Sequence, residues 1–361
     1  MAVGDPIYFE GNILDFKERP SGFFSEAEVD ITTPNDLLYP ILQTRVLTQD
    51  GYRTVAPLGS WRDVLSSTEI YNAMDNFGYR FKVHRGFIFA ETDIIYDRYV
   101  EYFNNIKTNT PKNDSMYLIS KLLMNGLFGK TGQDYKFNDT LILNENSLVN
   151  YIQDKRFEVS SITQLTDDLK LASIIDNKKY SHTIPESYQG CVAHASEIAA
   201  GARVEMSLII KFLKDNGYKI YYMDTDSVFT DKPLPDHLVS KTELGKLKLE
   251  NIYKEAVFLA PKVYAGITQS GEEVIKIKGL SYDTIERDVS LELLKSLLYK
   301  NKSLTFNHIK SFRKIDKSTI SLLNQTYNLI PTENKRKLNY DNNNLLISTK
   351  PFFINHDKKL Q

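Results

Sequence analysis

The stretch YYMDTDSVFT, residues 221–230, places Asp224 and Asp226 inside a run of aromatic and β-branched residues. Such a run is typical of a buried strand, where unpaired carboxylates are strongly unfavourable. Alternate residues of a strand face the same side, so the two carboxylates would lie together, roughly 6 to 7 Å apart. Three arrangements relieve this cost: an exposed turn, pairing with Lys or Arg, or a bound cation. The residue types alone favour a β-turn, because Asp and Ser are common turn residues.

A metal site is the main alternative for the same pair. Mg²⁺ usually takes one or two protein carboxylates and completes its shell with water and substrate phosphates. A strand–turn–strand would present Asp224 and Asp226 at the tip of a sheet, and the flanking aromatic residues would hold the turn rigid. The rest of the chain must therefore decide between a simple turn and a metal site.

Length and composition are those of an ordinary globular protein. The chain has 361 residues, 42% of them hydrophobic and 25% charged, which allows two or three subdomains. Its formal net charge is −1, so any phosphate binding must depend on local basic groups. The single cysteine, Cys191, excludes an intramolecular disulfide and a thiolate zinc site. No apolar run approaches membrane-spanning length, and the first residues resemble neither a signal peptide nor a transit peptide.

Hydrophobic periodicity predicts an α+β fold. Helices are expected at 61–76, 93–106, 115–132, 191–215 and 289–299, and strands at 23–29, 79–84, 257–268 and 273–277. Asp93 is a candidate N-cap for the second of these helices, and Asp114 or Ser115 for the third. Because only a short Pro-containing loop separates them, these two helices are expected to form an antiparallel hairpin. The irregular alternation of strands and helices is typical of the α+β class.

Three motifs, in this order, resemble those of family B DNA polymerases. Residues 121–129, KLLMNGLFG, resemble the K-x-x-x-N-S-x-Y-G motif of the fingers helix. Residues 222–227, YMDTDS, are similar to the Y-x-D-T-D-S motif, and residues 262–264, KVY, resemble the K-x-Y motif of the palm. The resemblance is closest to the protein-primed branch, particularly polymerases of mitochondrial linear plasmids. Two less specific blocks support it, YRTVAPLG at 52–59 and YNLIPTENKR at 327–336.

The resemblance implies a role for the carboxylates and for the fingers helix. Asp226 first, and Asp224 second, would be catalytic residues that bind Mg²⁺ or Mn²⁺. Lys121 would meet the triphosphate of the incoming nucleotide, and Asn125 and Phe128 would lie near the nascent base pair. From the residues alone, these three side chains fall at i, i+4 and i+7, a pattern more typical of an amphipathic helix with a solvated Lys and a Phe packed in a core.

The resemblance also implies contacts with DNA. Lys262 and Tyr264 would hold the primer terminus, and Lys276 and Lys278 could contact backbone phosphates. By the strand rule each pair shares a face, and a solvated strand face explains either pair when it is judged alone. The fingers motif departs from the family at two places, where Gly126 replaces Ser and Phe replaces Tyr. Both changes affect how the nucleotide would be positioned.

The implied fold is a partial right hand with palm, fingers and thumb. The expected layout is part of the palm at 1–28, a palm insertion that engages terminal protein and DNA at 29–92, the fingers hairpin at 93–132, the palm with the Asp pair at 133–285, and the thumb with a C-terminal segment at 286–361.

The upstream D-x-x-S-L-Y-P motif, which supplies the other catalytic carboxylate in the family, has no match in the chain. Residues 36–40, DLLYP, imitate it, but aligning them on Leu-Tyr-Pro puts Pro34 in the Asp position and leaves Asp36 out of register. We therefore expect a fold that lacks the first catalytic palm strand and the exonuclease domain.

The predicted function is template-directed DNA synthesis, protein-primed, by a fragment inactive on its own. The expected partners are a primer–template, deoxynucleoside triphosphates and a terminal protein, with no membrane, and the expected location is the mitochondrion. Two alternatives remain open, a catalytically dead DNA-binding remnant and one chain of a split polymerase. An unrelated metal-dependent nuclease would explain the Asp pair but neither of the other two motifs.

Overall fold

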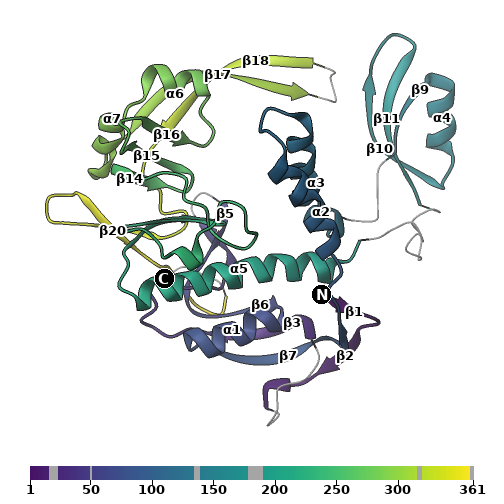
Figure 1. The fold of residues 1–361 in the computed structure, drawn as a ribbon. Coiled ribbons are helices and arrows are strands. Elements are labelled where there is room, and N and C mark those ends of the chain that lie inside the picture. The colour runs from purple at the N-terminus through teal and green to yellow at the C-terminus, as the bar shows by residue number, and fades with distance from the viewer. Residues whose placement is uncertain (16–22, 49–50, 134–138, 178–189, 315–318, 358–361) are drawn as a thin grey trace.

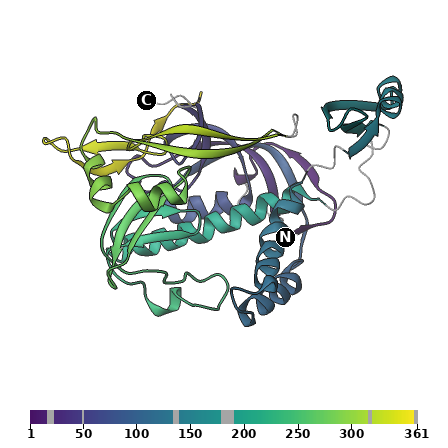
Figure 2. The same cartoon turned by 90° about the horizontal axis from the view of Figure 1, so that it is seen from above.

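A computed structural model describes residues 1–15, 23–48, 51–133, 139–177, 190–314 and 319–357. The chain forms a main body with a helical hairpin, a strand hairpin and a small separate unit projecting from it (Figures 1 and 2). The α+β class is confirmed. No helix in these ranges is both long and apolar enough to cross a membrane.

The main sheet has five strands in the order β2-β7-β3-β6-β21. Its strands are β2 (Ile7–Glu10), β3 (Phe23–Thr32), β6 (Leu58–Leu65), β7 (Arg80–Phe89) and β21 (Phe353–Ile354). Helices α1 (Ser67–Phe77) and α5 (Val192–Asp215) pack with this sheet, and short pairs flank it: β1 (Ala2–Val3) with β8 (Glu91–Thr92), and β4 (Thr44–Thr48) with β5 (Gly51–Val55). A 3₁₀ turn, η1 (Ile13–Asp15), follows β2. The expected boundary between residues 28 and 29 falls inside β3.

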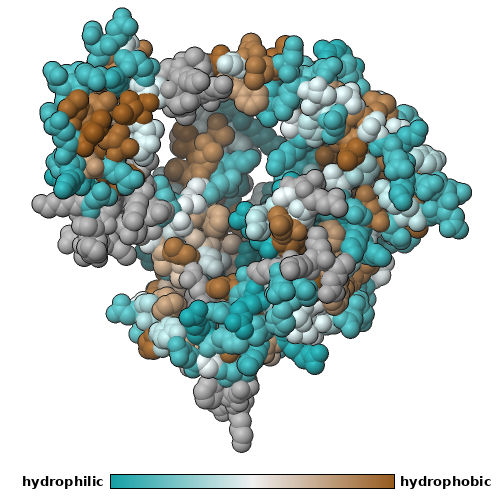
Figure 3. Space-filling model, turned by 180° about the vertical axis from the view of Figure 1, so that it is seen from behind, coloured by the Kyte–Doolittle hydropathy of each residue, from teal (hydrophilic) through white to brown (hydrophobic). Residues whose placement is uncertain are grey.

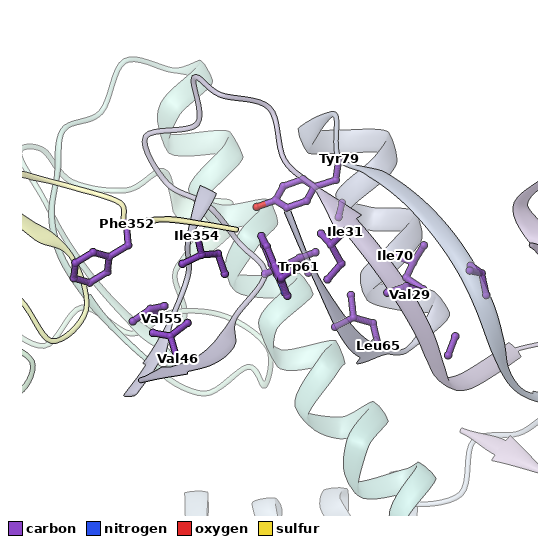
Figure 4. Packing of buried hydrophobic residues seen from close by; sticks show 14 of the residues in the cluster. Val29, Ile31, Val46, Val55, Trp61, Leu65, Ile70, Tyr79, Phe352 and Ile354 are labelled. Carbon is purple, nitrogen blue, oxygen red and sulfur yellow. The ribbon is translucent and has the colours of Figure 1, made fainter. Parts of the chain in front are cut away.

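Trp61, which is fully buried, lies at the centre of the core of this body. Figure 4 shows it among side chains from both ends of the chain, including Val55, Phe352 and Ile354. The prediction of a helix at 61–76 was wrong for its first five residues, which belong to β6. In β6 burial alternates, and Ser66 then caps α1 by accepting a hydrogen bond from the Glu69 N–H.

The predicted helical hairpin is present as α2 (Asp97–Asn109) and α3 (Ser115–Thr131). The Asp114 side chain caps α3 by accepting a hydrogen bond from the Met116 N–H at 2.7 Å. The expected start at Asp93 was wrong, because Asp93 instead bonds the chain's first residue through its backbone: its N–H donates to the Met1 carbonyl at 2.9 Å, and its carbonyl accepts from the Met1 ammonium at 3.0 Å.

Residues 139–176 form a small unit of their own. Strands β9 (Asp139–Asn144), β10 (Phe157–Gln164) and β11 (Leu169–Asp176) make a sheet in the order β10-β11-β9, covered by α4 (Glu145–Gln153). Leu148, Ala172 and Ile174 are its buried core. In the view from behind, this unit stands apart at the upper left with an exposed apolar patch, and the centre of the molecule is hollowed (Figure 3). The expected layout counts these residues as palm.

A second core lies between the β14-β15-β16 sheet and the helices that follow it. Its elements are β14 (Tyr253–Ala260), β15 (Val263–Thr268), β16 (Glu273–Ile277), α6 (Tyr282–Asp288), α7 (Leu291–Lys295) and η3 (Ser296–Leu298). The strand predicted at 257–268 is two strands joined by the Pro261-Lys262 turn. The helix expected at 289–299 is shorter, covering α7 and η3.

The C-terminal part of the chain returns to the main body. A long hairpin, β17 (Leu304–Lys314) with β18 (Thr319–Leu329), is followed by β19 (Lys337–Tyr340) paired with β20 (Leu346–Lys350). The chain then inserts β21 beside β6, where Phe353 and Ile354 lie parallel to Leu58 and Gly59. The last described strand is thus part of the core formed by the first 80 residues.

Candidate active site

The Asp224–Asp226 segment is a tight turn between two short strands, β12 (Ile220–Asp224) and β13 (Ser227–Thr230). The Asp226 N–H donates to the Asp224 carbonyl at 2.7 Å, which closes a three-residue turn around Thr225. Thr225 has a φ of 53°, a backbone conformation that is uncommon outside glycine. The Ser227 hydroxyl donates to the same carbonyl at 3.0 Å. The turn interpretation is therefore correct, and both carboxylates lie at the tip of the hairpin.

An aromatic cluster supports the base of this turn. The Tyr222 ring stacks on Phe258 of β14 with centroids 5.4 Å apart, and it lies 5.8 Å from Phe229 on the partner strand. Tyr264 of β15 packs against both Tyr222, at 5.6 Å, and Phe229, at 5.2 Å. Burial raises the pKa of Tyr222 and of Tyr264, so both phenols stay protonated at neutral pH. These contacts join the two-stranded hairpin to the β14-β15-β16 sheet.

Lys262 joins the two turns directly. It occupies the second central position of the Pro261-Lys262 turn with a φ of 62°, the pattern of a type II turn, so the expected strand position was wrong. Its backbone N–H donates to the Tyr222 hydroxyl at 2.7 Å. Its Nζ lies 2.5 Å from Asp224 Oδ2, and this hydrogen bond raises the pKa of Lys262. The K-x-Y and D-T-D motifs thus form one site.

Asp226 is exposed, and no hydrogen bond or ion pair holds its side chain within the described ranges. These ranges contain no group of three or more His, Cys, Asp or Glu side chains that could hold a metal ion. Asp226 could supply one ligand to a single divalent cation, and Asp224 a second one if it released Lys262, which fits the small protein share of a Mg²⁺ shell. A two-metal site needs more carboxylates than this turn provides.

Asp30, an acidic residue of the main sheet, does not supply a further metal ligand. Its carboxylate accepts hydrogen bonds from Arg62 at 2.7 Å and lies 2.7 Å from His84 Nε2, and these contacts lower its pKa to about 2. The charge of Asp30 is already balanced where it lies, on β3.

The other predicted DNA contacts lie close to this site. Lys276 on β16 is directly opposite Tyr264 in register, so their side chains share a sheet face. The Lys278 N–H donates to the Lys262 carbonyl at 3.1 Å, and the Lys278 carbonyl accepts from the Tyr327 hydroxyl at 2.9 Å. The side chains of Lys276 and Lys278 are exposed, which leaves them accessible to a ligand.

The predicted nucleotide-binding residues are placed on a different element. Lys121, Asn125 and Phe128 are all exposed on α3, so the alternative of a solvated Lys121 agrees with the structure and that of a core Phe128 does not. In Figure 1 the α2–α3 hairpin stands across the molecule from β14–β16 and above α5. Within the described residues, no hydrogen bond or ion pair joins these three side chains to the Asp224 turn.

Sequence reasoning assigned no role to Lys335, whose charge interacts with those of Asp224 and Lys262. Its Nζ donates a hydrogen bond to the Thr54 carbonyl oxygen, joining the two blocks at 52–59 and 327–336. The neighbouring Arg336 donates to the Leu38 carbonyl at 2.9 Å. The only sequence signal was that both blocks resembled the same family.

Comparison with solved structures identifies the class of fold. The fold matches that of Phi29 DNA polymerase complexed with primer-template DNA and incoming nucleotide, with a TM-score of 0.61 over 91% of this chain and 54% of that one, at 17% identity. Phi29 DNA polymerase complexed with single-stranded DNA gives a TM-score of 0.59. The fold is therefore that of a DNA polymerase, as the motifs predicted.

Sequence comparison then defines the family. Residues 1–230 match the family of organellar and viral type B DNA polymerases, and the chain belongs to this family. It is 33% identical to a probable DNA polymerase of Ascobolus immersus, over 99% of this chain and 28% of that protein. It is 35% identical to one of Neurospora intermedia, over 90% of this chain and 33% of that protein. The chain thus spans about a third of the length of these relatives.

Proposed function

We propose that this chain carries the nucleotide- and primer-binding parts of a template-directed DNA polymerase, which adds deoxynucleotides to a primer hydroxyl and releases pyrophosphate. The observation that carries the proposal is the contact between the Asp224 turn and the Lys262 turn. It places a pair of carboxylates, a primary amine and two tyrosines within one small surface. Metal-binding and phosphate-binding groups must lie this close for phosphoryl transfer between DNA and a nucleotide.

The proposal gives each residue a chemical task. Asp226 and Asp224 would hold a divalent cation, Mg²⁺ or Mn²⁺, which would neutralise charge on the reacting phosphates. Lys262 and Tyr264 would hold the primer end, and Lys276 and Lys278 the adjoining backbone phosphates. Lys121 would bind the triphosphate as a mobile point charge, with Asn125 and Phe128 beside the base pair. The hollow at the centre of the molecule would receive the DNA (Figure 3).

We propose further that the chain as given is inactive on its own. Catalysis by two metals needs carboxylates from outside the Asp224 turn, and none gather there within the described ranges. A strand bearing D-x-x-S-L-Y-P, supplied upstream or by another chain, would complete the site.

The alternative is a DNA-binding remnant without activity, and the shortage of carboxylates favours it as much as it favours a split enzyme. Primer extension separates the two. Extension should be absent with the chain alone, should appear when the D-x-x-S-L-Y-P region is restored, and should be lost again in Asp226→Asn. A restored protein that binds DNA but never extends a primer would establish the remnant. Robust extension by the chain alone would contradict the requirement for a further strand.

The proposal also includes priming by a terminal protein and a location in mitochondria. The resemblance to the protein-primed branch supports a terminal protein as partner, with residues 29–92 as its contact region. A location in mitochondria is supported by the organellar part of the family. Fractionation of host cells with an antibody against the chain would test the location.

A further inference from the structure

Two segments distant in sequence meet beside the Asp224 turn. Lys335, between β18 and β19, donates its hydrogen bond to the carbonyl of Thr54 on β5, 281 residues away. Arg53 precedes Thr54, and its guanidinium donates to the carbonyl of the adjacent Tyr52, at 3.1 Å. The Arg53 guanidinium is therefore left without an acidic partner in the described part of the chain.

The electrostatic surroundings of Lys335 connect it with the proposed active site. Burial is the main cause that lowers its pKa, and the positive charges of Arg53 and Lys262 lower it further, while Asp224 acts in the opposite direction. Since such effects act at short range, Lys335 lies near Arg53, Lys262 and Asp224. Asp226 adds a second carboxylate, which acts on Lys262. The Asp224 carboxylate is already bound by the Lys262 ammonium at 2.5 Å.

Within the described residues, no acidic side chain of the segment between β18 and β19 pairs with Lys335. Glu333, two residues before Lys335, accepts a hydrogen bond from the Leu338 N–H at 2.8 Å. Lys335 and Lys262 are exposed and Arg53 is half-buried, and like charges held close together repel one another unless an anion joins them. The surplus cations are also notable in a chain with a formal net charge of only −1.

We propose that Lys335 and Arg53 form a phosphate-binding site next to the Asp224 turn. This inference rests on the proposed function and extends it to residues outside the three motifs. The ligand is a phosphate group, either of the DNA backbone or of a nucleoside triphosphate. Lys335 supplies a point charge, and Arg53 a planar fork that matches two phosphate oxygens. The hydrogen bond to Thr54 holds the Lys335 ammonium beside β5.

The first measurement is the salt dependence of primer–template binding, followed by fluorescence anisotropy of a labelled duplex. Lys335→Gln removes the charge but keeps an N–H donor for the Thr54 carbonyl, and Arg53→Gln likewise removes the charge of Arg53. Lys335→Arg keeps the positive charge and should bind the duplex as the wild type does. Lys214→Gln, at an exposed position near the end of α5, is the matched control. Each lost phosphate contact should reduce the slope of log K against log salt by about 0.7 to 0.9, and the control should leave it unchanged.

The second measurement uses a fluorescent deoxynucleoside triphosphate in place of DNA, with the same variants. Weaker duplex binding with unchanged nucleotide binding identifies the DNA backbone as the source of the phosphate. The reverse result identifies the triphosphate. Circular dichroism of each variant checks that the fold is retained.

Two results would overturn the inference, and they differ in what else they exclude. If the wild type binds the duplex or the nucleotide but Lys335→Gln and Arg53→Gln bind both equally well, the phosphate site is wrong and the proposed function stands. If the wild type binds neither ligand at any salt concentration, the proposed function fails and the phosphate site fails with it.

Discussion

The ammonium of Lys262 lies 2.5 Å from a carboxylate oxygen of Asp224, so an ion pair joins the turns of two hairpins that lie 38 residues apart in the chain. The two carboxylates of the D-T-D turn are therefore not equivalent. Asp224 already has a cation, whereas Asp226 faces solvent. Replacing Asp226 is therefore expected to affect metal binding differently from replacing Asp224.

Divalent metal binding should depend mainly on Asp226. Asp226→Ala should weaken Mn²⁺ binding roughly tenfold or more, since it removes the free carboxylate. The double variant Asp224→Ala/Lys262→Ala removes an ion pair that carries no net charge, so its Mn²⁺ affinity should fall less than that of Asp226→Ala. Calorimetric titration measures both, with Asp168→Ala in the separate β9–β11 unit as a control. Equal affinities for the wild type and both variants would leave the turn without a metal-binding role.

The C-terminal segment around β21 should contribute strongly to the stability of the main body. Phe352 is 4% exposed in the core around Trp61, and replacing a buried Phe by Ala usually costs about 3 to 5 kcal/mol. Phe353, its neighbour, is 40% exposed, so Phe353→Ala should cost only about 1 kcal/mol. Urea unfolding curves of both variants measure the difference. Equal losses would show that the C-terminal segment does not stabilise the body through Phe352.

Gly59→Ala should displace β21 from β6. A Cβ at Gly59 would lie 2.0 Å from the Ile354 carbonyl oxygen, and the φ of 110° already disfavours a side chain. Gly11 has a similar φ of 105° with no atom within 4 Å of its Cβ position, so Gly11→Ala reports the backbone strain alone. Only Gly59→Ala should increase proteolysis of the C-terminal segment. Equal cleavage in both variants would contradict the close contact.

The stability of the main sheet should fall in acid through Asp30. Its folded pKa of about 2 lies below its ordinary value of 3.8, so its contribution is present above pH 4 and lost as the pH falls towards 2. Because Arg62 is half exposed, solvent screening limits this contribution to about 1 kcal/mol. The difference in unfolding free energy between the wild type and Asp30→Asn should thus shrink from pH 5 to pH 3. A difference that stays constant would mean that the ion pair has no effect.

The predicted elements that the structure confirms are those with strong local sequence signals. The hairpin of α2 and α3 and the long helix α5 have the right periodicity, and Asp114 caps α3 as expected. The errors arose where tertiary contacts override the local pattern. Asp93 looks like a cap, but its backbone is bonded to Met1. Pro261 and Lys262 sit in an apolar run, but a turn interrupts the strand there.

The sequence by itself determined the family, the class of fold and the residues of the motifs, because these depend on residue identity and short spacing. Only the tertiary structure decided which of them meet. It paired Asp224 with Lys262, left Lys121 on a separate helix, and brought Lys335 to Thr54. It also placed Phe352 in the core of the N-terminal sheet. The physical reason is that long-range contacts follow from how whole elements bury apolar surface together, and no local pattern encodes them.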